Sequence, residues 1–142
     1  MTQHSYYYER ILNGPDQLID KVNESVTLLE QVADTFDCIA VTGVSGMIVG
    51  SAVAVRLRKQ LIVVRKTIAN CHAEQLVEGE PVDSYRYVIV DDCVCTGRTV
   101  RRIREHLKGD HASTLLYDNY GCPSLSSLPT PTKSETCSNT SN

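Results

Sequence analysis

The stretch that decides the fold runs from residue 88 to residue 99 and reads VIVDDCVCTGRT. A short apolar run, typical of a buried strand, ends in the carboxylates Asp91 and Asp92, and a turn containing Gly97 then opens a helix. The amides and hydroxyls at such a helix start can hold a phosphate, and glycine lets the backbone approach the anion closely. Two carboxylates beside a phosphate would repel it, so they must face sugar hydroxyls or hydrated Mg²⁺ instead. The stretch therefore predicts a site for a sugar phosphate.

Outward from this stretch, apolar runs alternate with helical patterns along most of the chain. Strands are predicted at 38–41, 61–64, 85–90 and 113–117, and helices from residue 15 to about 36, from 47 to 58 and from 99 to 107. This alternation implies right-handed crossovers, and hence an α/β fold with a Rossmann-like, doubly wound, mainly parallel sheet and flanking helices. Ligands bind such sheets at the carboxyl ends of the strands, so the loops to inspect are 42–46, 65–80 and 91–99.

The sequence predicts one folded domain over residues 1–122 and a tail over residues 123–142. The tail holds six Ser, four Thr and three Pro, and this composition cannot bury enough apolar surface to fold, so we expect disorder there. The polar segment 67–84 has no hydrophobic period and contains Gly79 and Pro81, which predicts a long mobile loop.

Composition and charge argue against several classes of protein. The chain has 142 residues, with 14 Lys plus Arg against 17 Asp plus Glu, so a nucleic-acid partner is not expected. The stretch 38–55 is uncharged, but its glycines and hydroxyls argue against a membrane span, and no membrane partner is expected. The N-terminus lacks the pattern of a secretory signal, which predicts a cytoplasmic protein with reduced cysteines. A metal or redox protein built on those cysteines is an alternative, although Cys93 and Cys95 lack the spacing of a zinc motif.

The stretch 88–99 resembles the signature of the type I phosphoribosyltransferases: an apolar strand, two acidic residues, three variable residues, and Thr-Gly-x-Thr or Ser. The resemblance implies that family's fold, a Mg²⁺ cofactor, and phosphoribosyl pyrophosphate as substrate. It implies that Asp91 and Asp92 bind the ribose hydroxyls and hold Mg²⁺ mostly through water. It further implies that the 5-phosphate and ribose of the donor are bound by Val94, Cys95, Thr96, Gly97, Arg98 and Thr99.

Two further segments resemble the same family, in the same order along the chain. The segment after the first strand resembles the one that binds pyrophosphate through backbone groups, and its residues are Val44, Ser45 and Gly46. Arg65 and Lys66 resemble the Arg-Lys pair of orotate and adenine phosphoribosyltransferases, where a cation suits the pyrophosphate. The family's mobile loop often carries a lysine or arginine, which segment 67–84 lacks, and His72 is the candidate to replace it. The resemblance therefore implies four catalytic residues, namely Asp91, Asp92, His72 and Lys66.

The implied reaction transfers the 5-phosphoribosyl group to a nucleobase nitrogen and releases pyrophosphate, in nucleotide synthesis or salvage. An orotate or adenine type is preferred to an oxopurine type, because Cys95 stands where the hypoxanthine-guanine branch has an aspartate. The base-recognition hood is expected to be minimal, since only residues 1–36 and the few after 118 could build it. A homodimer is expected by resemblance. The alternative is a non-catalytic regulatory module of the same fold that binds phosphoribosyl pyrophosphate or a nucleotide.

Overall fold

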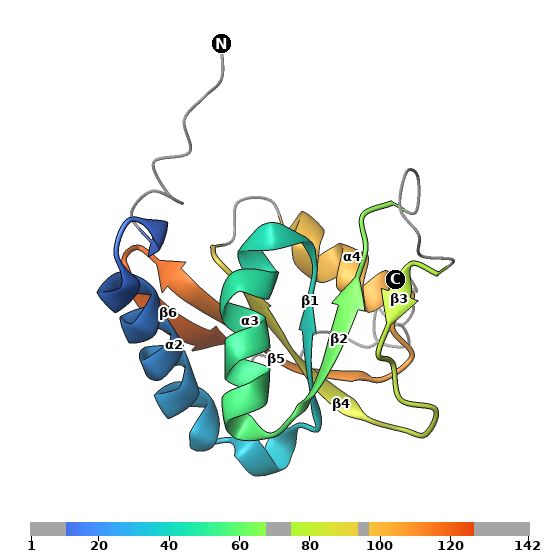
Figure 1. Ribbon diagram of the computed structural model, residues 1–142. Coiled ribbons are helices and arrows are strands. Elements are labelled where there is room, and N and C mark those ends of the chain that lie inside the picture. Colours follow the sequence, from blue (N-terminus) through green and yellow to red (C-terminus); the bar gives the residue numbers. More distant parts are fainter. Residues whose placement is uncertain (1–10, 68–74, 94–96, 127–142) are drawn as a thin grey trace, which may run out of the picture.

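The computed structural model describes residues 11–67, 75–93 and 97–126, which form one six-stranded sheet with helices on both faces (Figure 1). The strand order is β3-β2-β1-β4-β5-β6. The four central strands run parallel, and β3 and β6 pair antiparallel at the two edges. The predicted α/β fold with a mainly parallel sheet is therefore confirmed.

The strands and helices alternate along most of the described chain. The strands are β1 (Cys38–Val41), β2 (Gln60–Val64), β3 (Val77–Glu78), β4 (Arg86–Asp91), β5 (Asp110–Asn119) and β6 (Cys122–Ser126). The helices are α2 (Pro15–Glu30), the 3₁₀ turn η1 (Ala33–Thr35), α3 (Gly43–Leu57) and α4 (Arg98–His106). Among the described residues, no helix has the length and apolar character to cross a membrane.

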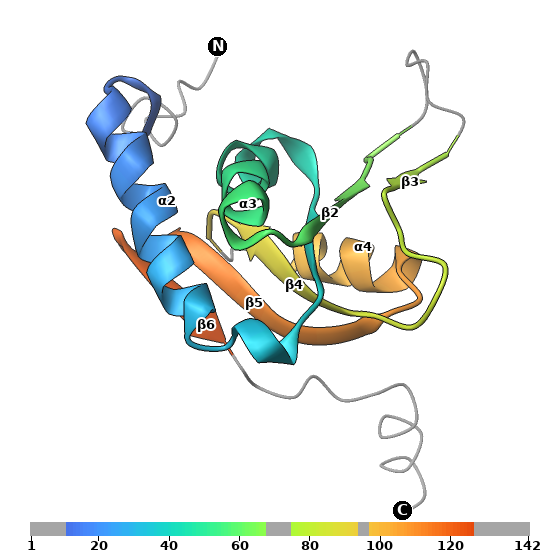
Figure 2. The ribbon, with the colours of Figure 1, turned by 60° about the horizontal axis from the view of Figure 1, so that its bottom comes forward.

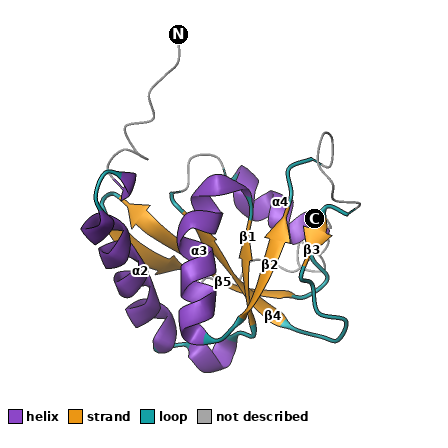
Figure 3. Cartoon of the chain, in the orientation of Figure 1, coloured by secondary structure: helices purple, strands orange, loops and turns teal. Residues whose placement is uncertain are grey.

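Two apolar cores lie on the two faces of the sheet. Helices α2 and α3 cover one face, and α4 covers the other (Figures 1, 2 and 3). Because side chains alternate along a strand, β4 serves both cores: Val88 and Val90 face α3, whereas Tyr87 and Ile89 face α4. Strand β1 is buried along its whole length, as expected of a central parallel strand.

Helix α3 packs very close to the sheet because two glycines, one turn apart, face it. A Cβ at Gly46 would lie 2.9 Å from the carbonyl oxygen of Val90, and one at Gly50 would collide with the side chain of Val41. The glycines therefore bring the start of α3 against the carboxyl end of β4, where the acidic pair lies.

Three sequence predictions on helices and loops need correction. The helix predicted to reach residue 36 ends at Glu30, and the buried Phe36 follows the separate 3₁₀ turn. Helix α3 begins at Gly43 and not at residue 47, so the predicted loop 42–46 is mostly its first turn. Segment 67–84 is not a continuous loop, because β3 lies within it and pairs with β2.

The predicted domain boundary at residue 122 is also wrong. Strand β5 is longer than predicted and turns through Tyr120 and Gly121, which both have positive φ, into the edge strand β6. This two-residue hairpin carries the ordered chain to Ser126, because main-chain pairing stabilises a strand that has few apolar side chains. The rest of the predicted tail, 127–142, lies outside the described residues.

Candidate functional site

The site predicted from the sequence lies at the carboxyl ends of the parallel strands, where α3 and α4 begin. Asp91 is the last residue of β4, and Ser45 belongs to the first turn of α3. The Ser45 hydroxyl donates a hydrogen bond to Asp91 Oδ1 at 3.2 Å. The fold thus brings the predicted pyrophosphate segment, Val44 to Gly46, into contact with the predicted ribose acid.

Asp91 is a buried carboxyl group, with only 6% of its surface exposed. Burial raises its pKa from 3.8 to about 6, and the nearby charge of Asp92 adds to the rise. A hydrogen bond from the Thr99 side chain acts in the opposite direction and lowers the pKa. Asp91 therefore changes its charge near pH 6 and is an anion at neutral pH.

Asp92 is less buried than Asp91, and its side chain folds back on its own turn. Its Oδ1 accepts a hydrogen bond from the backbone N–H of Cys93 at 2.7 Å. Its carbonyl oxygen accepts one from the N–H of Asp118 at 3.1 Å, which fixes the end of β4 against β5. The two acids therefore differ in their surroundings: Asp91 is buried, whereas Asp92 is partly exposed and bonded to the backbone of the next residue.

Lys66 lies at the N-terminal end of α3, close to the backbone of Gly43. A Cβ on Gly43 would come within 3.3 Å of Lys66 Cε and 3.4 Å of its Nζ, and Gly43 has a φ of +68°. The Lys66 carbonyl oxygen accepts a hydrogen bond from Arg102 Nη1 of α4 at 3.2 Å. A lysine ammonium beside a positive helix N-terminus makes a strongly anion-attracting position.

The structure does not bring Arg65 to the same place as Lys66. Arg65 Nη2 lies 3.1 Å from both carboxylate oxygens of Glu78 on β3, while its Nε is buried without a hydrogen-bond partner. Its backbone N–H donates to the carbonyl of Leu76 at 2.7 Å, so it extends the pairing at this edge of the sheet. The backbone bends at Lys66, one residue after Arg65, which separates the two cations.

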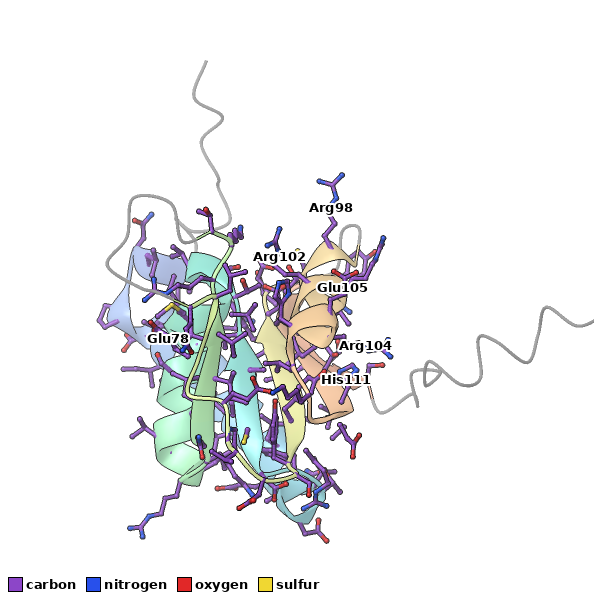
Figure 4. The ribbon with its side chains drawn as sticks, turned by 90° about the vertical axis from the view of Figure 1, so that its right-hand side faces the viewer. Glu78, Arg98, Arg102, Arg104, Glu105 and His111 are labelled. Carbon is purple, nitrogen blue, oxygen red and sulfur yellow. The ribbon has the colours of Figure 1, made fainter. Side chains whose placement is uncertain are left out.

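The predicted phosphate turn is described only at its end. Gly97 has a φ of +73° and is the N-cap of α4, and its carbonyl accepts a hydrogen bond from the N–H of Arg101. Arg98 follows as the first helical residue, and its side chain extends away from the end of the helix (Figure 4). Val94, Cys95, Thr96 and His72 lie outside the described residues.

Comparisons with known proteins identify similar chains. No protein-family model matches this sequence. It is 27% identical over 109 residues to an orotate phosphoribosyltransferase of Thermococcus gammatolerans, covering 75% of this chain and 58% of the relative. It is 30% identical over 105 residues to an orotate phosphoribosyltransferase of Cenarchaeum symbiosum, covering 74% and 48%. The chain thus spans about half the length of the curated relatives that it matches.

Solved structures give the same result for the fold. The orotate phosphoribosyltransferase of Aeropyrum pernix superposes with a TM-score of 0.63 at 22% identity, covering 76% of this chain and 62% of that one. The adenine phosphoribosyltransferase of Thermoanaerobacter pseudethanolicus superposes with a TM-score of 0.53 at 26% identity, covering 73% and 69%. The chain is similar in sequence and fold to orotate and adenine phosphoribosyltransferases. The resemblance first indicated by residues 88–99 is therefore confirmed.

The sequence analysis did not identify Tyr117 as a residue of the candidate site. Tyr117 is fully buried in β5, and its hydroxyl donates a 2.7 Å hydrogen bond to the carbonyl oxygen of Ser45. A usable signal existed, because a tyrosine within an apolar strand run needs a polar partner for its hydroxyl. The sequence does not tell which partner that is, since Ser45 is 72 positions away.

Asp91 and Asp92 fit the part that a protein supplies to a Mg²⁺ ion shared with a phosphorylated ligand. Among the described residues, no group of three or more His, Cys, Asp or Glu side chains could hold a metal ion. Mg²⁺ keeps several water ligands and commonly uses one or two carboxylates together with substrate phosphates. Asp91 and Asp92 supply two adjacent carboxylates at the predicted position, which is what such an ion requires of the protein.

Proposed function

We propose that this protein is a Mg²⁺-dependent phosphoribosyltransferase that transfers the 5-phosphoribosyl group of phosphoribosyl pyrophosphate to a nucleobase nitrogen. The observation that carries the proposal is the contact between Ser45 and Asp91, 46 positions apart. It joins a helix N-terminus suited to pyrophosphate with an acid suited to ribose hydroxyls. Relationship to orotate phosphoribosyltransferases supports the same activity.

In the proposed reaction the C1–O bond to pyrophosphate breaks, and its electron pair leaves with the pyrophosphate. A lone pair of the base nitrogen forms the new C1–N bond, and any proton on that nitrogen is lost to solvent or buffer. Lys66 and the first amides of α3 stabilise the departing charge, because the ammonium lies close to Gly43 at the start of the helix and the amides are held by the helix itself. Asp91 and Asp92 accept hydrogen bonds from the ribose hydroxyls and favour positive charge on the ribose. Bound Mg²⁺ would supply further neutralisation of the pyrophosphate.

The nucleobase is proposed to lie in a cleft beside the acidic pair. This cleft, of about 240 Å³, lies between α2 and the β5–β6 turn and is lined by Ile11, Gln17, Asp20, Lys21, Glu24, Asp118 and Gly121. All its lining residues except Asp118 come from the two segments that the sequence predicts for a minimal hood, residues 1–36 and the few after 118. Lys21 Nζ lies 3.5 Å from the buried Asp118 carboxylate and donates to the carbonyl of Gly121 at 2.7 Å. These charged and amide groups suit a polar base, and similarity to orotate and adenine phosphoribosyltransferases favours an orotate or adenine type. We also propose a cytoplasmic homodimer.

The rival proposal is a module of the same fold that binds the donor without turnover. The contact between Arg65 and Glu78 favours it, because the second predicted pyrophosphate cation is paired with a carboxylate of this chain. In an enzyme, this pairing would leave Lys66 to serve the leaving group. A binding module needs the ribose and phosphate contacts but has little use for leaving-group stabilisation.

One experiment separates the two proposals. Pyrophosphate release from phosphoribosyl pyrophosphate and Mg²⁺ is measured with orotate, adenine, uracil, guanine, hypoxanthine and xanthine in turn, alongside calorimetric binding of the donor. Turnover with one base establishes the enzyme and its substrate. Donor binding without turnover on any base establishes the binding module, and absence of donor binding refutes both.

A further inference from the structure

Ser45 makes two hydrogen bonds through two different groups, and each bond leads to a different strand. Its hydroxyl donates to Asp91 Oδ1 on β4 at 3.2 Å, and its carbonyl accepts from the Tyr117 hydroxyl on β5 at 2.7 Å. The three residues therefore form one chain of contacts, from the interior strand β5, through the first turn of α3, to the acid at the end of β4.

The Tyr117 hydroxyl has a role that apolar packing does not explain. The side chain is fully buried in the core under α2 and α3, where a phenylalanine would fill nearly the same volume. A buried hydroxyl is tolerated when it is hydrogen-bonded, and this one is bonded to a turn of α3 that carries the predicted pyrophosphate-binding amides. The hydroxyl thus ties the first turn of α3 to strand β5 of the sheet.

We propose that Tyr117 and the Ser45 hydroxyl are positioning residues that tie the ribose end of the donor site to its pyrophosphate end. Tyr117 fixes the turn, and the fixed Ser45 hydroxyl then orients the Asp91 carboxylate toward the ribose. This inference rests on the proposed function, since it treats the first turn of α3 and Asp91 as parts of one donor site. Neither residue is assigned any step of bond making or breaking.

The two positioning residues have different expected effects on the two halves of the donor. Tyr117→Phe loosens the whole turn, so it weakens binding of both inorganic pyrophosphate and ribose 5-phosphate. Ser45→Ala leaves the backbone of α3 unchanged but removes the contact to Asp91, so it weakens ribose 5-phosphate alone. Each loss is expected to be about fivefold, the factor that corresponds to one net hydrogen bond.

The test is calorimetric titration of the full chain, in the presence of Mg²⁺, with each of the two ligands. The double variant, with both Tyr117→Phe and Ser45→Ala, is expected to bind ribose 5-phosphate as tightly as the single variant that binds it more weakly. The two losses do not add, because the effect of Tyr117 on ribose binding passes through Ser45. Ser45→Thr keeps a hydroxyl and is expected to restore binding of ribose 5-phosphate. This rescue distinguishes positioning of Asp91 from a general loosening of the fold.

Matched controls come from the same chain. The Tyr85 side chain is also buried, just before β4 begins, and its hydroxyl donates to Glu80 at 2.7 Å. Tyr85→Phe is expected to leave both affinities unchanged. Ser51, whose hydroxyl donates to Met47 within α3, is the control for Ser45, and Ser51→Ala is likewise expected to be neutral.

Failure of this inference is distinguishable from failure of the proposed function. If the unaltered chain binds neither ligand, both are refuted. If it binds both ligands and Tyr117→Phe lowers stability as Tyr85→Phe does but leaves both affinities intact, only the inference is refuted. Additive losses in the double variant, or no rescue by Ser45→Thr, refute it as well. Should Tyr117→Phe not fold, the three Ser45 forms still decide whether the hydroxyl positions Asp91.

Discussion

Asp91→Asn is expected to stabilise the ligand-free protein at neutral and alkaline pH while it removes ribose binding. The Asp91 carboxyl is buried, and its pKa of about 6 exceeds the ordinary value of 3.8 by about two units. One unit corresponds to 1.36 kcal/mol, so the ionised side chain costs the folded state about 3 kcal/mol. An asparagine has no such cost, and its amide oxygen can still accept the hydrogen bond from Ser45.

The sign of the pH dependence follows from proton binding. Between pH 3.8 and pH 6 the folded chain holds the Asp91 proton more tightly than the unfolded chain does. The free energy of unfolding therefore decreases as pH rises through this range and loses nothing further from Asp91 above it. The gain from Asp91→Asn is accordingly smallest near pH 4 and reaches its full value near pH 8.

The assay is urea denaturation of the unaltered and Asp91→Asn chains at pH 4 and pH 8, without ligands. The difference in unfolding free energy between the two chains is expected to grow by about 2 kcal/mol from pH 4 to pH 8, because part of the full cost is already present at pH 4. Any effect of the asparagine amide on stability that does not depend on pH is the same at pH 4 and pH 8, and it cancels when the two differences are compared. A difference that is independent of pH, or that shrinks as pH rises, would show that Asp91 does not carry a buried, penalised charge.

Asp37→Asn provides a control of opposite sign. The side-chain hydrogen bond from Arg86 lowers the pKa of the exposed Asp37 below its ordinary value. Ionised Asp37 therefore stabilises the fold above pH 3.8, and that stabilisation is lost as pH falls. Asp37→Asn is expected to destabilise the protein at pH 8, and this effect is expected to disappear toward low pH. Asp91→Asn shows the same pH dependence but stabilises the protein.

Three further predictions concern the anion site, the packing of α3 and the edge of the sheet. Lys66→Ala is expected to weaken pyrophosphate binding by about 10- to 100-fold, as loss of a charge-assisted contact does, and to weaken binding of a nucleoside monophosphate much less in the same calorimetric assay. Gly50→Ala places a methyl group against Val41 and is expected to lower the unfolding free energy by about 1–3 kcal/mol. Ser51→Ala, at the next position of α3, is the control in denaturation and is expected not to lower it, because the Ser51 hydroxyl bonds only within the helix. Truncation after Tyr120 removes β6 and is expected to lower the thermal midpoint, while truncation after Ser126 retains it and is expected to leave the midpoint unchanged.

The elements that were predictable from sequence are those that the core determines. Strands β1, β2 and β4 are continuous apolar runs buried in the sheet, and the structure places them within one residue of their predicted positions. The edge strands β3 and β6 were missed because main-chain pairing with a neighbour stabilises them, and their own side chains carry little hydrophobic signal. The start of α3 was missed because its glycines are typical of a loop, whereas here they serve close packing of a helix on the sheet.

The candidate site shows a similar division, between residues and their contacts. A local motif identified Asp91, Ser45 and Lys66, since each lies next to a recognisable strand end or glycine. It could not tell that Ser45 contacts Asp91, because that contact depends on how closely α3 approaches β4. Nor could it separate Lys66 from Arg65, since the direction of a side chain after a strand end depends on what neighbours it. Pairing of β2 with β3 puts Glu78 beside Arg65, and one residue later the chain turns Lys66 toward the start of α3, so only tertiary structure distinguishes the two cations.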